Sequence, residues 1–319
     1  MKLLIGMLLA FGVLAHDAIA QKYPEKTVRI VTPFGPGGGT DIFGRLIAQR
    51  LTERFGQQFI VENRPGAGSL LGTELVAKAP PDGYTLLITS ASFSFNPGLY
   101  SSLRFDPLKD FTPITLVIRV PHVISVLPTF PAKSAPDLVN LARARPGDVL
   151  YASSGPGSAM HVAGAFFGIV TNTKLTHVPY KGGAATVTAV LSGEATAAFN
   201  TLETVIGQIK AGRIRAIAVS TRERALALPD VPTVIESGIK DYEIFGWFGL
   251  MAPAGTPPAL VEQLSGEINK IMTLPAMRDR VIADGGTPVG TTPAEFQRFV
   301  QSEIAKWTRV IKQAGIKGE

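Results

Sequence analysis

Short apolar segments alternate with amphipathic segments along most of the chain, and this alternation limits the folds that it can adopt. The apolar runs predict strands near residues 27–33, 57–62, 84–89, 149–152, 175–178, 195–199 and 214–219. Segments with helical periodicity predict helices near residues 41–55, 69–79, 134–144, 158–170, 184–192, 202–211, 257–273, 275–284 and 293–314. Short strands that alternate with amphipathic helices form βαβ units, so the sequence predicts an α/β fold with mostly parallel sheet.

Two extended stretches interrupt this alternation, and we expect the chain to cross between two domains at both of them. Residues 114–127 contain two extended runs joined at Pro121, and residues 242–253 form an apolar, aromatic run without helical spacing. Two crossings of this kind leave a cleft between two lobes and a hinge that can close it. The predicted division is lobe 1 at residues 21–120 together with 246–319, and lobe 2 at residues 121–245.

The first 20 residues have the features of a secretory signal peptide. Lys2 supplies the positive charge, LLIGMLLAFGVLA the apolar core, and Ala18-Ile19-Ala20 the small-residue cleavage site, so cleavage is expected after Ala20. The apolar run is short for a membrane span, and an uncleaved anchor is the alternative. The sequence contains no cysteine, which excludes disulfides and a cysteine-linked lipid anchor and fits a bacterial periplasm.

The net charge of +6 restricts the partners that can be expected. A positive charge suits nucleic acid, a membrane surface or an acidic small molecule. The basic residues occur singly or in pairs, as at Arg143/Arg145 and Arg222/Arg224, and no basic run is interleaved with aromatic residues. We therefore expect no nucleic-acid partner, and an acidic small molecule fits better.

The sequence lacks the usual arrangements of catalytic and metal-binding residues. Outside the signal peptide the histidines are His122, His161 and His177, and none has a second histidine or a carboxylate at metal-ligand spacing. No GxSxG motif, dinucleotide-binding turn or Walker loop is present. We therefore expect no metal, no cofactor and no catalytic activity. A hydrolase that uses Ser154 or Ser158 as its nucleophile is the enzymatic alternative.

Two glycine-rich turns carry the strongest indication of a binding site. GPGGGTD at 35–41 and SSGPGS at 153–158 each follow a predicted strand and lead directly into a predicted helix. Free N–H groups and the positive dipole end of such a helix can hold an anion. Thr40 can cap the first helix, and Asp41 in its first turn is either a capping group or a ligand contact. From the pattern alone, an ordinary strand–helix turn is the alternative for each loop.

Other polar groups also follow predicted strands. The segment VPYKGGA at 178–184 places Tyr180 and Lys181 after a strand, and Asn200 ends another strand. Lys181 is either a charge partner for an acid or a solvated surface residue, and His161 either faces the cleft or is structural. Open α/β sheets bind ligands at the carboxyl ends of their strands, so the agreement of these positions predicts one common site.

Several segments resemble one protein family over essentially the whole mature chain. They include YPEKTVRIVTPFGPGGGTDIFGRLIAQRL, VENRPGAGSLLGTELVAKAPPDGYTLL, YASSGPGSAMHVAG, HVPYKGGAATVTAVLSGEATAAFNTL and WFGLMAPAGTPPALVEQL. In these segments the chain resembles the Bug/TctC family of periplasmic solute receptors of tripartite tricarboxylate transporters. The resemblance implies a two-domain, type II (Venus flytrap) periplasmic-binding-protein fold that holds a small carboxylate between its lobes and has no catalytic activity. The implied partners are membrane transporter subunits, with a sensor kinase as the alternative, and we expect a monomer.

Matched position by position, the resemblance also implies which residues bind the ligand. These are Phe34, Gly39, Thr40, Asp41, Asn96, Ser153, Ser154, Gly157, Ser158, His161, Tyr180, Lys181, Gly182, Gly183 and Asn200.

Two departures from the family pattern bear on the ligand. In SASFSFNPGLY, Phe93 and Phe95 are expected to flank the pocket side of Asn96, which leaves room for an aromatic acid. Asn200 stands where many relatives have aspartate, so the counter-charge for a ligand amine is absent. We therefore expect a dicarboxylic, tricarboxylic or aromatic acid without an amino group.

Overall fold

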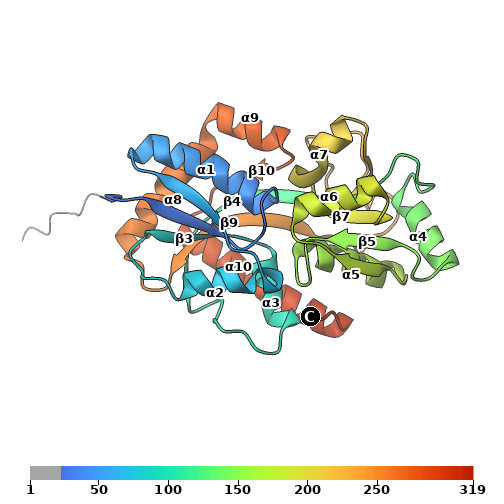
Figure 1. The fold of residues 1–319 in the computed structure, drawn as a ribbon, viewed down its shortest axis with the longest axis horizontal. Helices are drawn as coiled ribbons and strands as arrows, with labels where there is room; N and C mark the ends of the chain where they lie inside the picture. Colours follow the sequence, from blue (N-terminus) through green and yellow to red (C-terminus); the bar gives the residue numbers. More distant parts are fainter. Residues whose placement is uncertain (1–22, 319) are drawn as a thin grey trace, which may run out of the picture.

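The computed structural model describes residues 23–318, which form two α/β lobes joined side by side (Figure 1). The predicted signal peptide and its cleavage site lie outside these residues. The strands of lobe 1 are β1 (Val28–Thr32), β2 (Phe59–Asn63), β3 (Thr85–Ser90), β9 (Phe245–Pro253) and β10 (Thr287–Pro288). Those of lobe 2 are β5 (Leu150–Ser153), β6 (Thr176–Pro179), β7 (Ala197–Thr201) and β8 (Arg215–Val219). The strand β4 (Phe111–Val126) belongs to both sheets.

Helices cover the faces of both sheets. Lobe 1 carries α1 (Gly39–Phe55), the short 3-10 helix η1 (Ala67–Ser69), α2 (Leu70–Ala77), α3 (Ser92–Leu99), α8 (Pro258–Thr273), α9 (Pro275–Ala283) and α10 (Pro293–Ala314). Lobe 2 carries α4 (Ala135–Ala144), α5 (Ala159–Thr171), α6 (Gly183–Ser192) and α7 (Leu202–Lys210). Within residues 23–318, none of the helices has the length and apolar character needed to cross a membrane.

Both lobes are built on the same plan. In lobe 1, β1 lies between β2 and β3 and is parallel to both, and in lobe 2, β5 lies between β6 and β7 and is parallel to both. A crossing strand is added antiparallel to each unit: β9 pairs with β3, and the end of β4 pairs with β7. The carboxyl ends of the parallel strands are where open α/β sheets bind ligands, so the loops after β1 and β5 hold corresponding positions in the two lobes.

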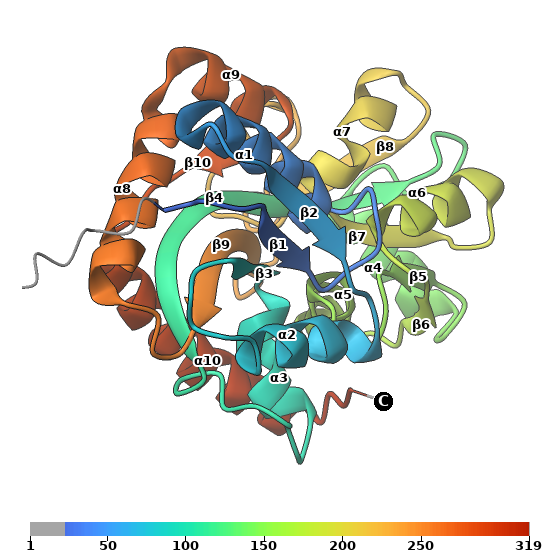
Figure 2. The same ribbon diagram turned by 60° about the vertical axis from the view of Figure 1, so that its left-hand side comes forward.

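The long strand β4 connects the two sheets without a break and curves strongly along its length (Figure 2). It pairs with β9 from Phe111 to Pro121 and with β7 from His122 to Val126. Proline has no N–H to donate to the hydrogen bonds between strands. Pro121 is tolerated because it lies where the pairing with β9 ends and the pairing with β7 begins. The two extended runs expected on either side of Pro121 are therefore one strand. The residue boundaries of the lobes remain a prediction.

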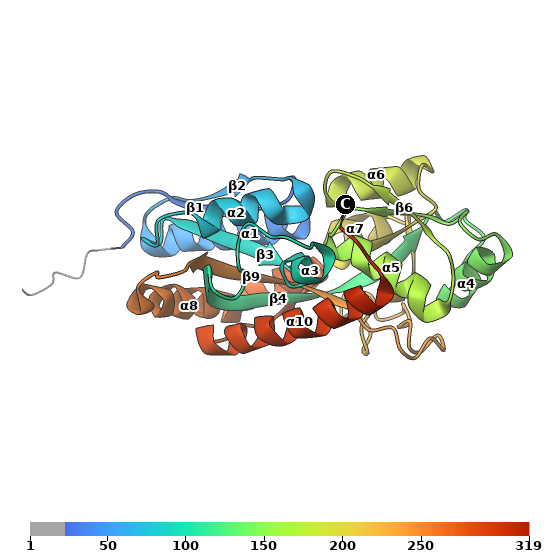
Figure 3. The same cartoon turned by 90° about the horizontal axis from the view of Figure 1, so that it is seen from below.

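The lobes share part of their hydrophobic core through α10. Figure 3 shows α10 running along lobe 1 towards lobe 2. Its Trp307 packs on Phe95 of α3, with ring centroids 5.0 Å apart, and on Phe166 of α5, 5.7 Å apart. The helix begins with a capping box in which Thr292 and Glu295 exchange hydrogen bonds, a motif that fixes the start of a helix.

The predicted α/β fold with two lobes is confirmed, and each predicted helix and strand is present within a few residues of its expected bounds. The helix α3 was not expected. It contains Pro97, and a residue that precedes proline avoids the helical conformation, so its sequence gives no helical signal. Six of its eight residues are buried, so packing determines this helix despite the proline.

Candidate ligand-binding cleft

The loops that follow the parallel strands of the two lobes meet across a closed cleft. A Cβ atom added to Gly37, in the loop after β1, would lie 3.1 Å from Cβ of Ala184 in lobe 2. A Cβ atom added to Gly35 would lie 3.3 Å from the carbonyl oxygen of Lys181. A Cβ atom on Gly68 of η1 would overlap the carbonyl oxygen of Pro156. The backbones of the two lobes are therefore in contact around the cleft.

Two cavities lie between these loops and share Phe34 and Ser154 in their walls. The inner cavity is small, about 40 Å³, and is lined by Phe34, Gly38, Gly39, Thr40, Ser90, Ser154, Ala159, Met160, Gly183, Thr201, Gly246 and Phe248. The outer cavity is about 690 Å³ and includes Pro36, Gly66, Ser69, Ser154, Tyr180, Lys181 and Gly182 in its wall. Both lobes contribute to the wall of each cavity, so both cavities lie between the lobes.

The N-termini of α1 and α5 both lie at the inner cavity. In α1 the N–H groups of Gly39 and Thr40 have no hydrogen-bond acceptor among residues 23–318. In α5 the same holds for Ala159 and Met160 over that part of the chain. Unpaired N–H groups and two positive dipole ends, one from each lobe, give the cavity the chemistry of an anion site.

Asp41 holds the loop before α1 in place. Its Oδ2 accepts from the N–H of Gly37 (3.0 Å), and its Oδ1 accepts from Nε of Arg45 (2.9 Å) and Nδ2 of Asn63 (3.1 Å). Burial acts to raise the pKa of this carboxyl, but the hydrogen bonds from Arg45, Gly37 and Asn63 together lower it below its usual value. Both oxygens therefore have partners within lobe 1, and Asp41 does not line either cavity.

Neutral groups hold the corresponding loop of lobe 2. Ser158 caps α5 by accepting from the N–H of His161 (3.2 Å), and the ring Nδ1 of His161 accepts from the N–H of Gly157 (3.1 Å). That ring stacks on His177, with centroids 4.0 Å apart, and Nε2 of His177 lies 2.6 Å from Oγ of Ser153. Burial lowers the pKa of His161 to about 4 and, with the charge of His161, that of His177 to about 3. Both rings are therefore neutral at pH 7.

The predicted residues Asn200 and Asn96 are buried away from both cavities. Asn200 accepts from Oγ of Ser125 (2.8 Å) and donates to Oγ1 of Thr186 (2.6 Å), so its amide is used within lobe 2. Asn96 donates to Oγ of Ser69 (3.4 Å), at the edge of the outer cavity. Both side chains support loops near the cleft.

The expectation that Phe93 and Phe95 flank the pocket is wrong. Both side chains are fully buried in the core. Phe93 packs on Phe111, with ring centroids 5.2 Å apart, and Phe95 packs on Trp307. Successive residues of a helix point in different directions, and the core of lobe 1 surrounds α3 on both of these faces. The sequence-based reason for an aromatic ligand is therefore lost.

The structure thus divides the predicted residues into those that line the cleft and those that shape it. The inner cavity contains Phe34, Gly39, Thr40, Ser154 and Gly183, and the outer cavity adds Tyr180, Lys181 and Gly182. The supporting group contains Asp41, Asn96, Ser153, Gly157, Ser158, His161 and Asn200. The sequence analysis missed Ser90, Ala159, Met160, Thr201, Gly246 and Phe248 in the inner cavity. Ser90 and Thr201 are the last residues of β3 and β7. Open α/β sheets bind ligands at the carboxyl ends of their strands, so applying this rule to every strand predicts both residues.

The two serines of the enzymatic alternative, Ser154 and Ser158, have no general base beside them among residues 23–318. Oγ of Ser158 accepts from a backbone N–H, and no histidine ring within residues 23–318 bonds to Ser154 or Ser158. The serine that does meet a histidine, Ser153, is fully buried. A nucleophile requires both a base within reach and access to substrate. No group of three potential metal ligands is found in this part of the chain.

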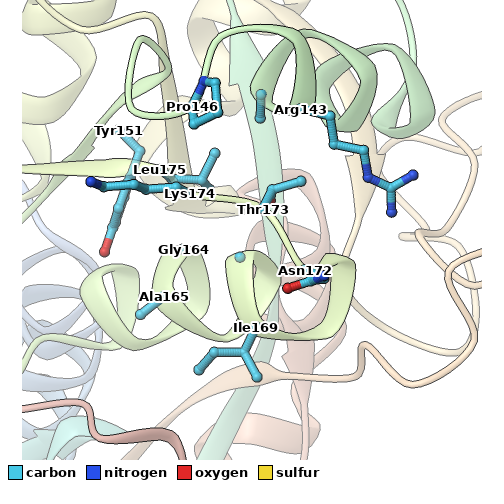
Figure 4. Close-up of a pocket in the computed structure, with 12 residues that line it drawn as sticks. Arg143, Pro146, Tyr151, Gly164, Ala165, Ile169, Asn172, Thr173, Lys174 and Leu175 are labelled. Atoms are coloured by element: carbon cyan, nitrogen blue, oxygen red, sulfur yellow. The ribbon is translucent and has the colours of Figure 1, made fainter.

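A further cavity of about 640 Å³ lies on lobe 2 between α4 and α5, away from the cleft. Figure 4 shows that its two cationic side chains, Arg143 and Lys174, point to opposite sides. Its wall contains Ile169 and Leu175, and its polar groups do not converge. Binding sites combine a concave shape with a few convergent polar groups, so the cleft between the lobes is the better candidate.

Known proteins share this sequence and this fold. Residues 43–316 match the family described as tripartite tricarboxylate transporter family receptor. The protein BugT of Bordetella pertussis is 34% identical over 98% of this chain and 97% of its own length. The structure of Rpa4515 of R. palustris with adipate has 36% identity and a TM-score of 0.89, covering 92% of this chain and 99% of that one. MatC of Rhodopseudomonas palustris with bound malate has 28% identity and a TM-score of 0.87, covering 91% and 100%.

Proposed function

The chain belongs to the family of tripartite tricarboxylate transporter receptors, and on this basis we propose that it binds a small carboxylate between its two lobes. Proteins of this family are solute receptors and not enzymes. The observation that carries the proposal is the meeting of the N-termini of α1 and α5 at one cavity. Four unpaired N–H groups there, those of Gly39, Thr40, Ala159 and Met160, are suitable donors for a carboxylate.

The strength of these donors is sufficient for a receptor. A hydrogen bond to a charged group contributes about 1.5–3 kcal/mol, and a micromolar complex requires about 8 kcal/mol. Four such bonds therefore supply roughly that energy, and dispersion contacts with Phe34, Met160 and Phe248 add to it. Closure of the cleft removes water from around the bonds and strengthens them.

The second end of the ligand is proposed to extend into the outer cavity. Lys181 lies in the wall of this cavity and is exposed, so it can pair with a second carboxylate. The structures of two similar proteins contain adipate and malate, which are both dicarboxylates. We therefore propose a dicarboxylate as the ligand class.

Release and delivery follow from the same arrangement. We propose that residues 21–120 with 246–319 and residues 121–245 move as two bodies about β4, which pairs in both sheets, and about the start of β9, where the chain returns to lobe 1. The exported protein, cleaved after Ala20, is proposed to carry its ligand through the periplasm to the membrane subunits of a tripartite transporter.

A thermal-shift series tests the binding proposal. The exported protein is heated with adipate, malate, citrate or benzoate, each over a range of concentrations. A ligand at a hundredfold excess over its Kd stabilises by about 2.7 kcal/mol, so at least one dicarboxylate should raise the Tm by several degrees. Benzoate serves as the comparison for an acid without a second carboxylate. A Tm that none of the four acids changes contradicts the proposal.

A further inference from the structure

Glu203, in the first turn of α7, places a carboxyl group inside the closed interface between the lobes. The side chain is buried, with the residue 6% exposed. Its Oε1 accepts from the hydroxyl groups of Thr201 and Thr204, the latter at 3.2 Å. Its Oε2 is buried and has no partner among residues 23–318. A buried carboxylate oxygen without a donor is costly, and it indicates either a functional role or a proton on that oxygen.

The carboxyl group packs against the opposite lobe at the start of α1. A Cβ atom added to Gly39 would overlap Oε1 of Glu203 and the ring of Phe248. Gly39 and Thr201 both line the inner cavity, and the carboxyl group of Glu203 lies against both of them. It therefore lies next to the residues that form the wall of this cavity. The carboxyl group of Glu203 therefore lies against Gly39, the first residue of α1, whose N–H is proposed to hold the ligand.

The charged and titratable groups on the neighbouring elements do not neutralise Glu203. Asp284, in the turn after α9, acts to raise its pKa and itself accepts from Arg280 (2.6 Å). Asp41 of α1 is paired with Arg45. His122 of β4 lies opposite Thr201 and is neutral, because burial lowers its pKa to about 4. Burial is the main cause that raises the pKa of Glu203 to about 7.

We propose that Glu203 binds a proton together with the ligand, so that the closed cleft takes up an anion and a proton as a pair. This inference rests on the proposed function, because it requires an anion in the inner cavity. Two negative charges in one water-poor interface repel each other, so the binding of one acid favours the neutral form of the other. The proton comes from solvent and adds to the carboxylate of Glu203, and no covalent bond other than this O–H changes.

The hydrogen bonds from Thr201 and Thr204 act to lower the pKa of Glu203, but burial outweighs them, and their geometry is compatible with the neutral acid. The hydroxyl groups of Thr201 and Thr204 donate to Oε1, which is the carbonyl oxygen of the protonated form. The proton is then carried by Oε2, where no donor is present to conflict with it. Glu203 is thus a positioning residue that acts on the ligand through its charge.

Isothermal titration of the exported protein with adipate and with malate, between pH 6.5 and 9, tests the inference. Both acids are fully ionised in this range, and the buried histidines are neutral. The affinity should fall about tenfold for each pH unit above the pKa of Glu203, because one proton is bound with each ligand. Repeating the titration in buffers of different ionisation heat should show close to one proton taken up at pH 8.5, and this measurement needs no variant.

Two variants complete the test. Glu203→Gln keeps the shape of the side chain without a titratable group, so its affinity should not depend on pH, and it should take up no proton. Asp284→Asn, the matched control, should keep the slope and shift the profile to lower pH. Binding by the wild type without proton uptake, or an unchanged slope in Glu203→Gln, overturns the inference and leaves the proposed function intact. Failure of both acids to bind at every pH instead refutes the dicarboxylate site on which the inference rests.

Discussion

The loops before α1 and α5 occupy the same position in the two lobes, but they are held in different ways. The loop of lobe 1 is fixed by a charged side chain, Asp41, which bonds to Gly37, Arg45 and Asn63. The loop of lobe 2 is fixed by uncharged groups, the cap Ser158 and the stacked pair His161 and His177. In the part of the chain that the structure describes, each arrangement leaves two N–H groups of its helix without an acceptor at the inner cavity.

The comparison suggests a design for the proposed anion site that needs no cation in its wall. The charge of Asp41 is balanced by Arg45 inside lobe 1, and the histidines of lobe 2 are kept neutral by burial. Among the residues that the structure describes, no lysine, arginine or histidine lines the inner cavity. Backbone N–H groups are fixed in direction and keep their protons at neutral pH, and each lobe supplies two of the four donors, so any movement of the lobes apart would divide the donor set.

Lowering the pH should reveal the largest difference between the two loops in their contribution to the free energy of unfolding. The unfolded chain protonates His161 below about pH 6.5, whereas the folded protein resists protonation until its pKa of about 4. Stability is therefore full above pH 6.5 and is lost as the pH falls towards 4, by roughly 3 kcal/mol for this residue alone. His161→Asn keeps an acceptor for the N–H of Gly157 and should remove that part of the loss, measured by urea unfolding at several pH values.

Asp41 should behave differently in the same experiment. Its pKa is lowered in the folded state, so its contribution is present above its unfolded value and is lost only as the pH falls through the lower folded one. Asp41→Asn should therefore leave the slope between pH 6.5 and 4.5 unchanged. If His161→Asn keeps the full slope while Asp41→Asn removes it, the assignment of the two loops is reversed.

Removing the side chains that hold the two loops should lower the free energy of unfolding by different amounts. Asp41→Ala leaves three donors without their shared acceptor and should lower the free energy of unfolding by about 2 kcal/mol, a value that allows for the exposure of Arg45. Ser158→Ala removes one helix cap and should cost about 1 kcal/mol, with Ser158→Gly costing a few tenths. Urea unfolding at pH 7 measures all three. Equal losses of stability for Asp41→Ala and Ser158→Ala contradict the claim that the loop of lobe 1 is held more strongly than the loop of lobe 2.

The smallest effect on stability is expected at Ser154, which lines both cavities. Its side chain has no hydrogen-bond partner among the residues that the structure describes, so Ser154→Ala should change the free energy of unfolding by less than about 0.5 kcal/mol. The hydroxyl group is available to the ligand, so the same variant should bind adipate about tenfold more weakly. Unchanged affinity removes Ser154 from the binding site.

The sequence was sufficient to predict most of the helices and strands, α3 excepted, and the loops that meet at the cleft. Apolar runs and helical periodicity located the strands and helices, and the glycine-rich turns located the edge at which Gly39 and Ser154 lie. The direction of each side chain was not predictable, because it depends on packing. His161 lies in the first turn of α5 and Asn200 near the end of β7, close to the cleft as expected, yet both side chains make their hydrogen bonds within lobe 2. The position of Glu203 requires contact with Gly39 of the other lobe, which no local pattern contains.

The central claim is that the ligand carboxylate is held by the N-termini of α1 and α5 together. Amide ¹⁵N–¹H spectra of the exported protein, recorded with increasing adipate, test it most directly. The amide protons of Gly39, Thr40, Ala159 and Met160 should all move downfield with one common binding curve, because each gains a hydrogen bond to a carboxylate. Saturation of the protein with adipate while these four amides stay in place, or movement of the pair in one lobe only, contradicts the account.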